Sequence, residues 1–150
     1  MMEMKKPLVL VVDDDLETLQ LLKLALNRAG FDTQIASNWQ EVDDRILMSY
    51  QQERVINAIV LDLMMPERSG FDILRTMQVA LVPMPPVIML TAVVGTEQRI
   101  DALDLGVTKY LTKPTTPSKL VEALKEVIGK TQTGPLKNPR DKFPPKSFTR

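Results

Sequence analysis

Three short runs of apolar residues mark the chain, and none shows the alternation of polar and apolar positions that a half-exposed strand has. They are Leu8–Val12, Ala58–Leu61 and residues 87–90. Unbroken runs of this length suit strands that are buried on both faces, as in a parallel sheet covered by helices. Two further strands are predicted over residues 33–36 and 107–111, where the apolar pattern is weaker.

Segments with the period of a helix follow the predicted strands. In the first, leucines recur at helical spacing between the acids at 13–15, which suit a helix N-cap, and Gly30, which suits the other end. Ser37 or Asn38 caps the second helix. The helices from the second to the fifth are predicted over residues 39–52, 71–80, 97–105 and 117–128. This alternation of strands and helices predicts an α/β fold with a doubly wound, parallel five-stranded sheet and helices on both faces.

The composition removes several kinds of chemistry from consideration. The 150 residues contain no cysteine and no histidine. Within them, a disulfide framework, a thiolate nucleophile, a Ser-His-Asp triad and an imidazole metal ligand are therefore excluded. Any metal must be held by oxygen atoms, which favours Mg²⁺, Mn²⁺ or Ca²⁺.

The C-terminal residues differ in kind from the rest. Residues 131–150 carry a formal charge of +4 and four prolines, whereas residues 1–130 carry −4. We predict one folded domain over 1–130 and a flexible Pro/Lys-rich tail or linker over 131–150. A nucleic-acid-binding arm is the alternative for the tail, but its few aromatic residues argue against direct nucleic-acid binding. No apolar run is long enough to span a membrane or form a signal peptide, which predicts a cytoplasmic protein.

Polar residues follow four of the predicted strands. Asp13 and Asp14 follow the first strand, Asp62 the third, Thr91 the fourth and Lys113 the last. Ligands of doubly wound sheets bind beyond the carboxyl ends of the strands, so these side chains are expected to converge. Each has an ordinary structural explanation when taken singly, as a helix cap, a turn residue or a surface lysine. Their joint occurrence at successive strand ends favours a site.

The chemistry of these residue types points to a phosphate and a metal. Two carboxylates about 4 Å apart repel each other by roughly 4 kcal/mol at an effective dielectric near 20, so such a cluster needs a cation. With oxygen ligands alone, Mg²⁺ fits best, and Mn²⁺ is also allowed. A spare carboxylate such as Asp62 can accept a phosphoryl group. Lys113 and the Thr91 hydroxyl can then stabilise the phosphoryl oxygens.

Four motifs extend this constellation. They are VLVVDDD at 9–15, IVLDLMMPERSG at 59–70, PVIMLTA at 86–92 and GVTKYLTKP at 106–114. Together they resemble the receiver domain of two-component response regulators, over about residues 7–129. The resemblance implies a flavodoxin-like (βα)5 fold with sheet order 2-1-3-4-5.

The resemblance also implies roles at the acidic site. Asp62 matches the phosphorylated aspartate. Asp14 matches the acid that binds Mg²⁺ directly, and Asp13 matches the acid that often acts through water. Met64 matches the position whose backbone carbonyl completes the metal site, so its side chain is not a ligand.

Three further positions match residues that respond to the phosphoryl group. Thr91 matches the switch hydroxyl that moves to the phosphate, and Tyr110 the aromatic that changes rotamer with it. Lys113 matches the lysine that pairs with the phosphoryl group, and the bond to Pro114 is usually cis in the family. The implied output surface is the face formed by the fourth helix, fifth strand and fifth helix, here about residues 97–128.

The resemblance implies a phosphoacceptor that assists its own phosphorylation and dephosphorylation rather than an enzyme with a separate substrate. The family's donor is a histidine kinase or a histidine phosphotransfer protein. Because these 150 residues hold no histidine, the phosphohistidine would belong to a partner. The output would pass to a downstream protein or a fused output domain, and a homodimer formed on phosphorylation is also allowed.

Three other functions compete with this one. A flavodoxin-like FMN module would place phosphate in the first loop, where Asp13–Asp15 repel it unless a metal intervenes. A Mg²⁺-dependent phosphatase that forms an aspartyl phosphate usually needs a second acid two residues after the nucleophile, where this chain has Met64. A receiver-like interaction scaffold that is never phosphorylated stays open as the alternative.

Overall fold

The computed structural model describes residues 5–65, 67–93 and 95–132. The predicted tail, residues 131–150, therefore lies almost wholly outside the described residues, as do the first four residues of the predicted domain. Within the described residues, no helix is long and apolar enough to cross a membrane.

A five-stranded parallel sheet forms the centre of the molecule. Its strands are β1 (Leu8–Val12), β2 (Asp32–Ala36), β3 (Ala58–Leu61), β4 (Val87–Thr91) and β5 (Lys109–Thr112). They lie in the order β2-β1-β3-β4-β5, and all neighbouring pairs are parallel. The predicted fold class and strand order are confirmed.

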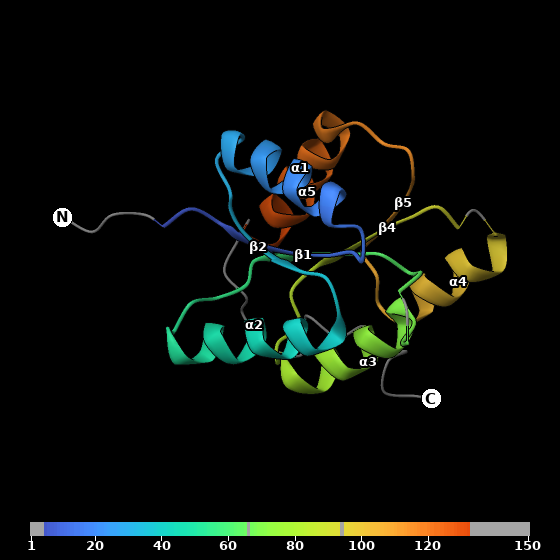
Figure 1. The fold of residues 1–150 in the computed structure, drawn as a ribbon, viewed down its shortest axis with the longest axis horizontal. Coiled ribbons are helices and arrows are strands. Elements are labelled where there is room, and N and C mark those ends of the chain that lie inside the picture. Colours follow the sequence, from blue (N-terminus) through green and yellow to red (C-terminus); the bar gives the residue numbers. More distant parts are fainter. Residues whose placement is uncertain (1–4, 66, 94, 133–150) are drawn as a thin grey trace.

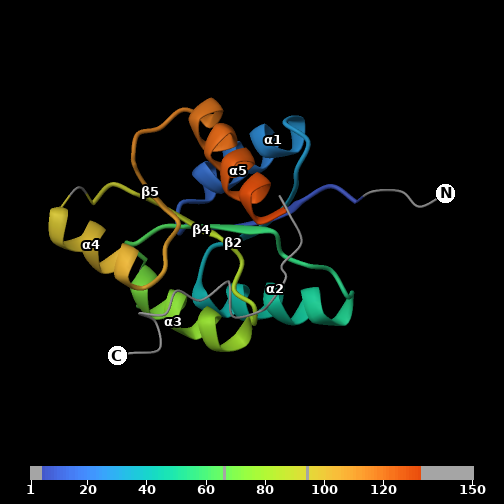
Figure 2. The ribbon, with the colours of Figure 1, turned by 180° about the vertical axis from the view of Figure 1, so that it is seen from behind.

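Helices cover both faces of this sheet (Figures 1 and 2). One face carries α1 (Leu16–Arg28) and α5 (Pro117–Gln132). The other carries α2 (Trp39–Gln51), α3 (Gly70–Ala80) and α4 (Thr96–Asp104). Each helix between two strands returns the chain to the end of the sheet at which the strands begin, so all five strands run in one direction.

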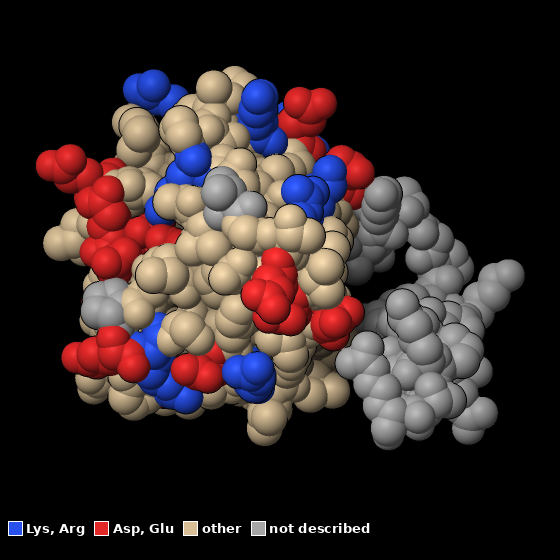
Figure 3. Space-filling model, turned by 90° about the vertical axis from the view of Figure 1, so that its right-hand side faces the viewer, with Lys and Arg blue, Asp and Glu red and all other residues tan. Residues whose placement is uncertain are grey.

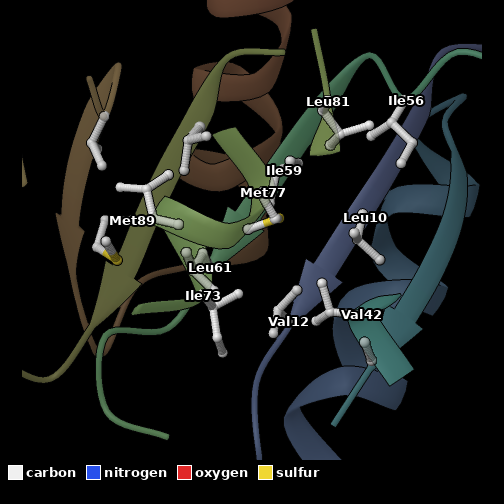
Figure 4. Close-up of a cluster of buried hydrophobic side chains, with 14 of the residues drawn as sticks. Leu10, Val12, Val42, Ile56, Ile59, Leu61, Ile73, Met77, Leu81 and Met89 are labelled. Atoms are coloured by element: carbon white, nitrogen blue, oxygen red, sulfur yellow. The ribbon is translucent and has the colours of Figure 1, made fainter. Parts of the chain in front are cut away.

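The two-sided cover explains why the central strands show no polar alternation. Along β1, Leu8, Leu10 and Val12 pack into the cluster beneath α2 and α3, while Val9 and Val11 pack beneath α1 and α5. Figure 4 shows the first cluster, in which side chains from β1, β3 and β4 meet those of α2 and α3. A polar residue on either face would lose its water without gaining a partner.

Two predicted boundaries differ from the structure by two or more residues. The last strand begins at Lys109 rather than at residue 107, because the Val107 N–H still closes the end of α4 on the Ala102 carbonyl, at 3.0 Å. Gly106, in the left-handed region at φ 95°, makes that turn. The last helix runs to Gln132, four residues beyond the predicted end.

Gly70, the first residue of α3, allows a close approach of two backbone segments. A Cβ there would lie 2.5 Å from the Asp62 carbonyl oxygen and 2.8 Å from the Leu63 Cα. Both atoms belong to the main chain, so no side-chain rotation relieves the clash. We expect Gly70→Ala to lower the free energy of unfolding by about 2 kcal/mol, as overpacking does, in urea denaturation.

The matched control for Gly70 is Gly129 in α5, where an added Cβ meets nothing within 4 Å. Gly129→Ala is expected to stabilise the protein by up to about 1 kcal/mol, because alanine favours a helix. Equal effects of the two substitutions would show that the close approach at Gly70 is unimportant.

Candidate functional site

The four predicted strand ends do converge at the carboxyl edge of the sheet. The Lys113 ammonium lies 2.6 Å from Asp13 Oδ2 and 3.1 Å from Asp62 Oδ2. The Lys113 N–H donates to the Thr91 carbonyl at 2.7 Å, which holds the ends of β4 and β5 together. Residues up to 100 positions apart thus form one cluster.

Asp13, Asp14 and Asp62 form an acidic cluster. One carboxylate oxygen from each lies within 4.8 Å of the others, with Asp13 and Asp62 buried and Asp14 exposed. Figure 3 views the molecule from the side on which the strands end, where acidic side chains gather along one border. The neighbouring Asp15 serves the fold instead, because its carboxylate accepts from the Glu17 N–H and the Thr18 hydroxyl and caps α1.

Asp62 is held on both sides of its carboxylate. Its Oδ1 accepts from the Met64 N–H at 3.1 Å, and its Oδ2 accepts from Lys113. Its own N–H donates to the Val12 carbonyl, which ties β3 to β1. The chain then turns and enters α3, where the Ser69 hydroxyl accepts from the Asp72 N–H as the helix cap. The Asp62 carboxylate is therefore oriented both by the main-chain N–H of Met64 and by the ammonium group of Lys113.

The electrostatics show a site short of positive charge. Burial raises the pKa of Asp13 above its ordinary value, although the hydrogen bond from Lys113 pulls it down. Burial by itself lowers the pKa of Lys113, but its hydrogen bonds to Asp13 and Asp62 outweigh burial and raise it. One ammonium thus pairs with two of the three carboxylates, Asp13 and Asp62, and these contacts favour its protonated form.

A hard cation fits this donor set. The cluster offers only oxygen atoms, two of its three carboxylates are buried, and a single lysine leaves it with excess negative charge. Such sites suit Mg²⁺, which binds through one or two carboxylates and keeps several waters. Asp13, Asp14 and Asp62 are the residues that could hold it. The Met64 side chain is exposed, and the role of its backbone carbonyl at the metal stays a prediction.

Thr91 and Tyr110 both hold the chain at Val93. Thr91 is fully buried at the end of β4, and its Oγ1 accepts from the Val93 N–H at 3.3 Å. The Tyr110 hydroxyl donates to the Val93 carbonyl at 2.7 Å, and burial raises the pKa of this tyrosine. The two predicted switch residues are therefore connected through one loop residue.

Sequence reasoning missed Arg99 of α4, whose guanidinium lies 5.9 Å from the centre of the Tyr110 ring. No motif announces such a contact, because it depends on how α4 packs beside β5. The Lys113–Pro114 bond is cis, as the resemblance implied, and Val82–Pro83 is cis as well.

Comparison with known sequences gives one consistent match. The sequence model of the response regulator receiver domain family matches residues 9–125. The phosphate regulon transcriptional regulatory protein PhoB of Pseudomonas aeruginosa is 33% identical over 132 residues, which are 87% of this chain and 56% of that protein. A probable transcriptional regulator of Cyanophora paradoxa, ycf27, is 31% identical over 90% of this chain and 54% of its own length. The chain thus spans about half the length of these relatives.

Solved structures agree with the sequence matches. The receiver domain of the Francisella response regulator 1452 superposes with a TM-score of 0.71 at 31% identity, over 84% of this chain and 99% of that one. A CheY-like receiver domain protein of Methanospirillum hungatei superposes with a TM-score of 0.73 at 26% identity, over 83% of this chain and 95% of that one.

Proposed function

The chain belongs to the response regulator receiver family, and from this membership we propose that it is a signalling switch operated by phosphorylation of Asp62. The observation that carries the proposal is the placement of this carboxylate. It is buried beside Asp13 and Asp14, accepts from the Met64 N–H and pairs with Lys113.

In the proposed reaction, an Asp62 carboxylate oxygen attacks the phosphorus of a phosphohistidine on a partner protein. The new O–P bond forms as the P–N bond breaks, and the imidazole leaves with the electron pair of that bond. Lys113 pairs with the transferred phosphoryl oxygens, and the Thr91 hydroxyl donates to one of them. Asp13, Asp14, Asp62 and the Met64 carbonyl would hold Mg²⁺, which when bound neutralises charge on the carboxylates and phosphoryl oxygens.

The switch would pass through Val93. When the Thr91 hydroxyl turns toward the phosphoryl group, its contact with the Val93 N–H is lost, and the Tyr110 hydroxyl holds the same residue from the other side. Tyr110 lies on β5, next to α4 and α5. Phosphorylation would thereby change the α4–β5–α5 face by favouring one of two pre-existing states.

The partners follow from this chemistry. The phosphoryl donor is a histidine kinase or a histidine phosphotransfer protein. We propose the cytoplasm as the compartment. The output passes through protein contacts of the α4–β5–α5 face to a downstream protein or fused output domain, with a homodimer as one form. Transcriptional regulators among the relatives support such an output. Turnover of a separate substrate, direct binding of nucleic acid and membrane contact are not proposed.

Uptake of a phosphoryl group by the wild-type protein tests the proposal. We expect incubation with a small acyl phosphate and Mg²⁺ to add the mass of one phosphoryl group, measured on the intact protein. Chelation of the metal should suppress the gain, because the single lysine does not offset the negative charge of the acidic cluster. An unchanged mass under metal-replete conditions would favour the unphosphorylated scaffold instead.

A further inference from the structure

Arg68 connects the loop after Asp62 to two helices. Its guanidinium carbon lies 5.2 Å from the centre of the Trp39 ring, at the first residue of α2. Its Nη2 lies 3.4 Å from the Thr76 hydroxyl of α3, which in turn donates to the Asp72 carbonyl. We call Arg68, Trp39 and Thr76 the clip. Figure 1 shows α2 and α3 side by side on one face of the sheet, so the clip closes across them.

The loop that the clip holds includes Met64, whose main chain lies against Asp62 in the acidic site. It leaves β3 at Asp62, and its Met64 N–H donates to Asp62 Oδ1. Its base is closed by the Gly70 N–H, which donates to the Leu63 carbonyl at 2.7 Å. Between these points the Met64 side chain is 63% exposed, and Glu67 has a left-handed φ of 70°. The clip therefore restrains the outer part of the loop, beyond its closed base.

We propose that Arg68 is a positioning residue, which by stacking on Trp39 keeps the Met64 backbone against Asp62 and thereby strengthens metal binding. The inference rests on the proposed function, because the metal site is the one used for phosphoryl transfer. Trp39 is the only tryptophan of the chain, and neither it nor Arg68 takes part in the proposed reaction.

The sign of the effect separates positioning from simple charge. If only Coulomb forces act, removing the positive charge of Arg68 leaves cation binding at the acidic cluster unchanged or strengthens it. If Arg68 positions the loop, its removal weakens binding. A cation–π contact at a partly exposed site corresponds to a change of about two- to five-fold in an equilibrium constant.

The test is Mg²⁺ binding to the unphosphorylated full chain, measured by calorimetry. Arg68→Ala and Trp39→Leu are each expected to weaken binding about two- to five-fold, and the double variant should lose little more, because both remove one contact. Arg68→Lys, which keeps a cation over the ring, should retain most of the affinity. Arg75→Ala is the matched control, since it removes a guanidinium from α3 that pairs with Asp72, whereas among the described residues the cation–π contact with Trp39 is made by Arg68.

A second readout follows the loop without metal. Hydrogen exchange at the Met64 amide, which donates to Asp62, is expected to quicken about two- to five-fold in Arg68→Ala and to stay unchanged in Arg75→Ala. Unchanged or tighter Mg²⁺ binding in Arg68→Ala overturns the inference, as does unchanged exchange at Met64. If the wild type binds Mg²⁺ but takes up no phosphoryl group, the proposed function fails while the two measurements on Arg68 still decide the inference.

Discussion

Replacing Asp62 by asparagine is expected to abolish phosphoryl uptake from a small acyl phosphate in the presence of Mg²⁺. The amide lacks the anionic oxygen that attacks phosphorus, whereas its shape and its ability to accept from the Met64 N–H are retained. The fold should therefore persist. Intact mass after incubation is the measurement, and no variant protein with an added phosphoryl group should be found.

The control for this substitution is Asp72→Asn, which makes the same change of charge at an exposed carboxylate on α3. It should gain one phosphoryl group as the wild type does. A gain that persists in Asp62→Asn at the wild-type level would place the modification on another residue and overturn the proposal.

Replacing Lys113 by methionine is expected to destabilise the metal-free protein, because Asp13 and Asp62 lose the ammonium that both contact. Removing one partner of a fully buried ion pair costs about 3–5 kcal/mol. The Lys113 side chain is 26% exposed, so solvent screening reduces the expected loss to about 2 kcal/mol. Urea denaturation at about pH 8 measures it. Phosphoryl uptake should also fall, since the transferred oxygens lose their cationic partner.

The loss caused by Lys113→Met should depend on pH. The pKa of Asp13 already lies above its ordinary value of 3.8 and rises further without Lys113. A carboxyl whose pKa is raised by folding weakens the fold above that pKa, and the weakening disappears as pH falls toward 3.8. Lys113, whose pKa is raised above 10.5, stays protonated over this pH range, so its contribution to stability follows the ionisation of Asp13. The difference between variant and wild type should therefore be larger at about pH 8 than at about pH 4.5.

Two controls accompany the Lys113 variant. Lys109→Met removes an ammonium that pairs with Glu126 at the surface, and it should cost less than about 1 kcal/mol. Adding Mg²⁺ should stabilise Lys113→Met more than the wild type, because a metal ion replaces the missing positive charge. An equal response of both proteins to Mg²⁺ would mean that the metal does not bind at this cluster.

Much of the fold could be predicted from the chain itself. Strands buried on both faces need unbroken apolar runs, and Leu8–Val12 and Ala58–Leu61 have them because helices cover both sides. Asp62 and Lys113 could be assigned to one edge of the sheet, because parallel strands all end on the same side. The predicted roles of these residues stay predictions, but their proximity is a feature of the structure.

Other features needed the tertiary structure. The acids at 13–15 look alike in sequence, and only the turn into α1 decides that Asp15 caps the helix while Asp13 faces Lys113. Arg68 and Trp39 are separated by a helix, a strand and a turn, and no local pattern links them. Sequence by itself thus determined which strands are buried and which residues follow them, since burial on both faces requires an unbroken apolar run. Contacts made by packing between distant segments leave no such pattern in the sequence. The clip and the different contacts of Asp13 and Asp15 were therefore decided by the tertiary structure.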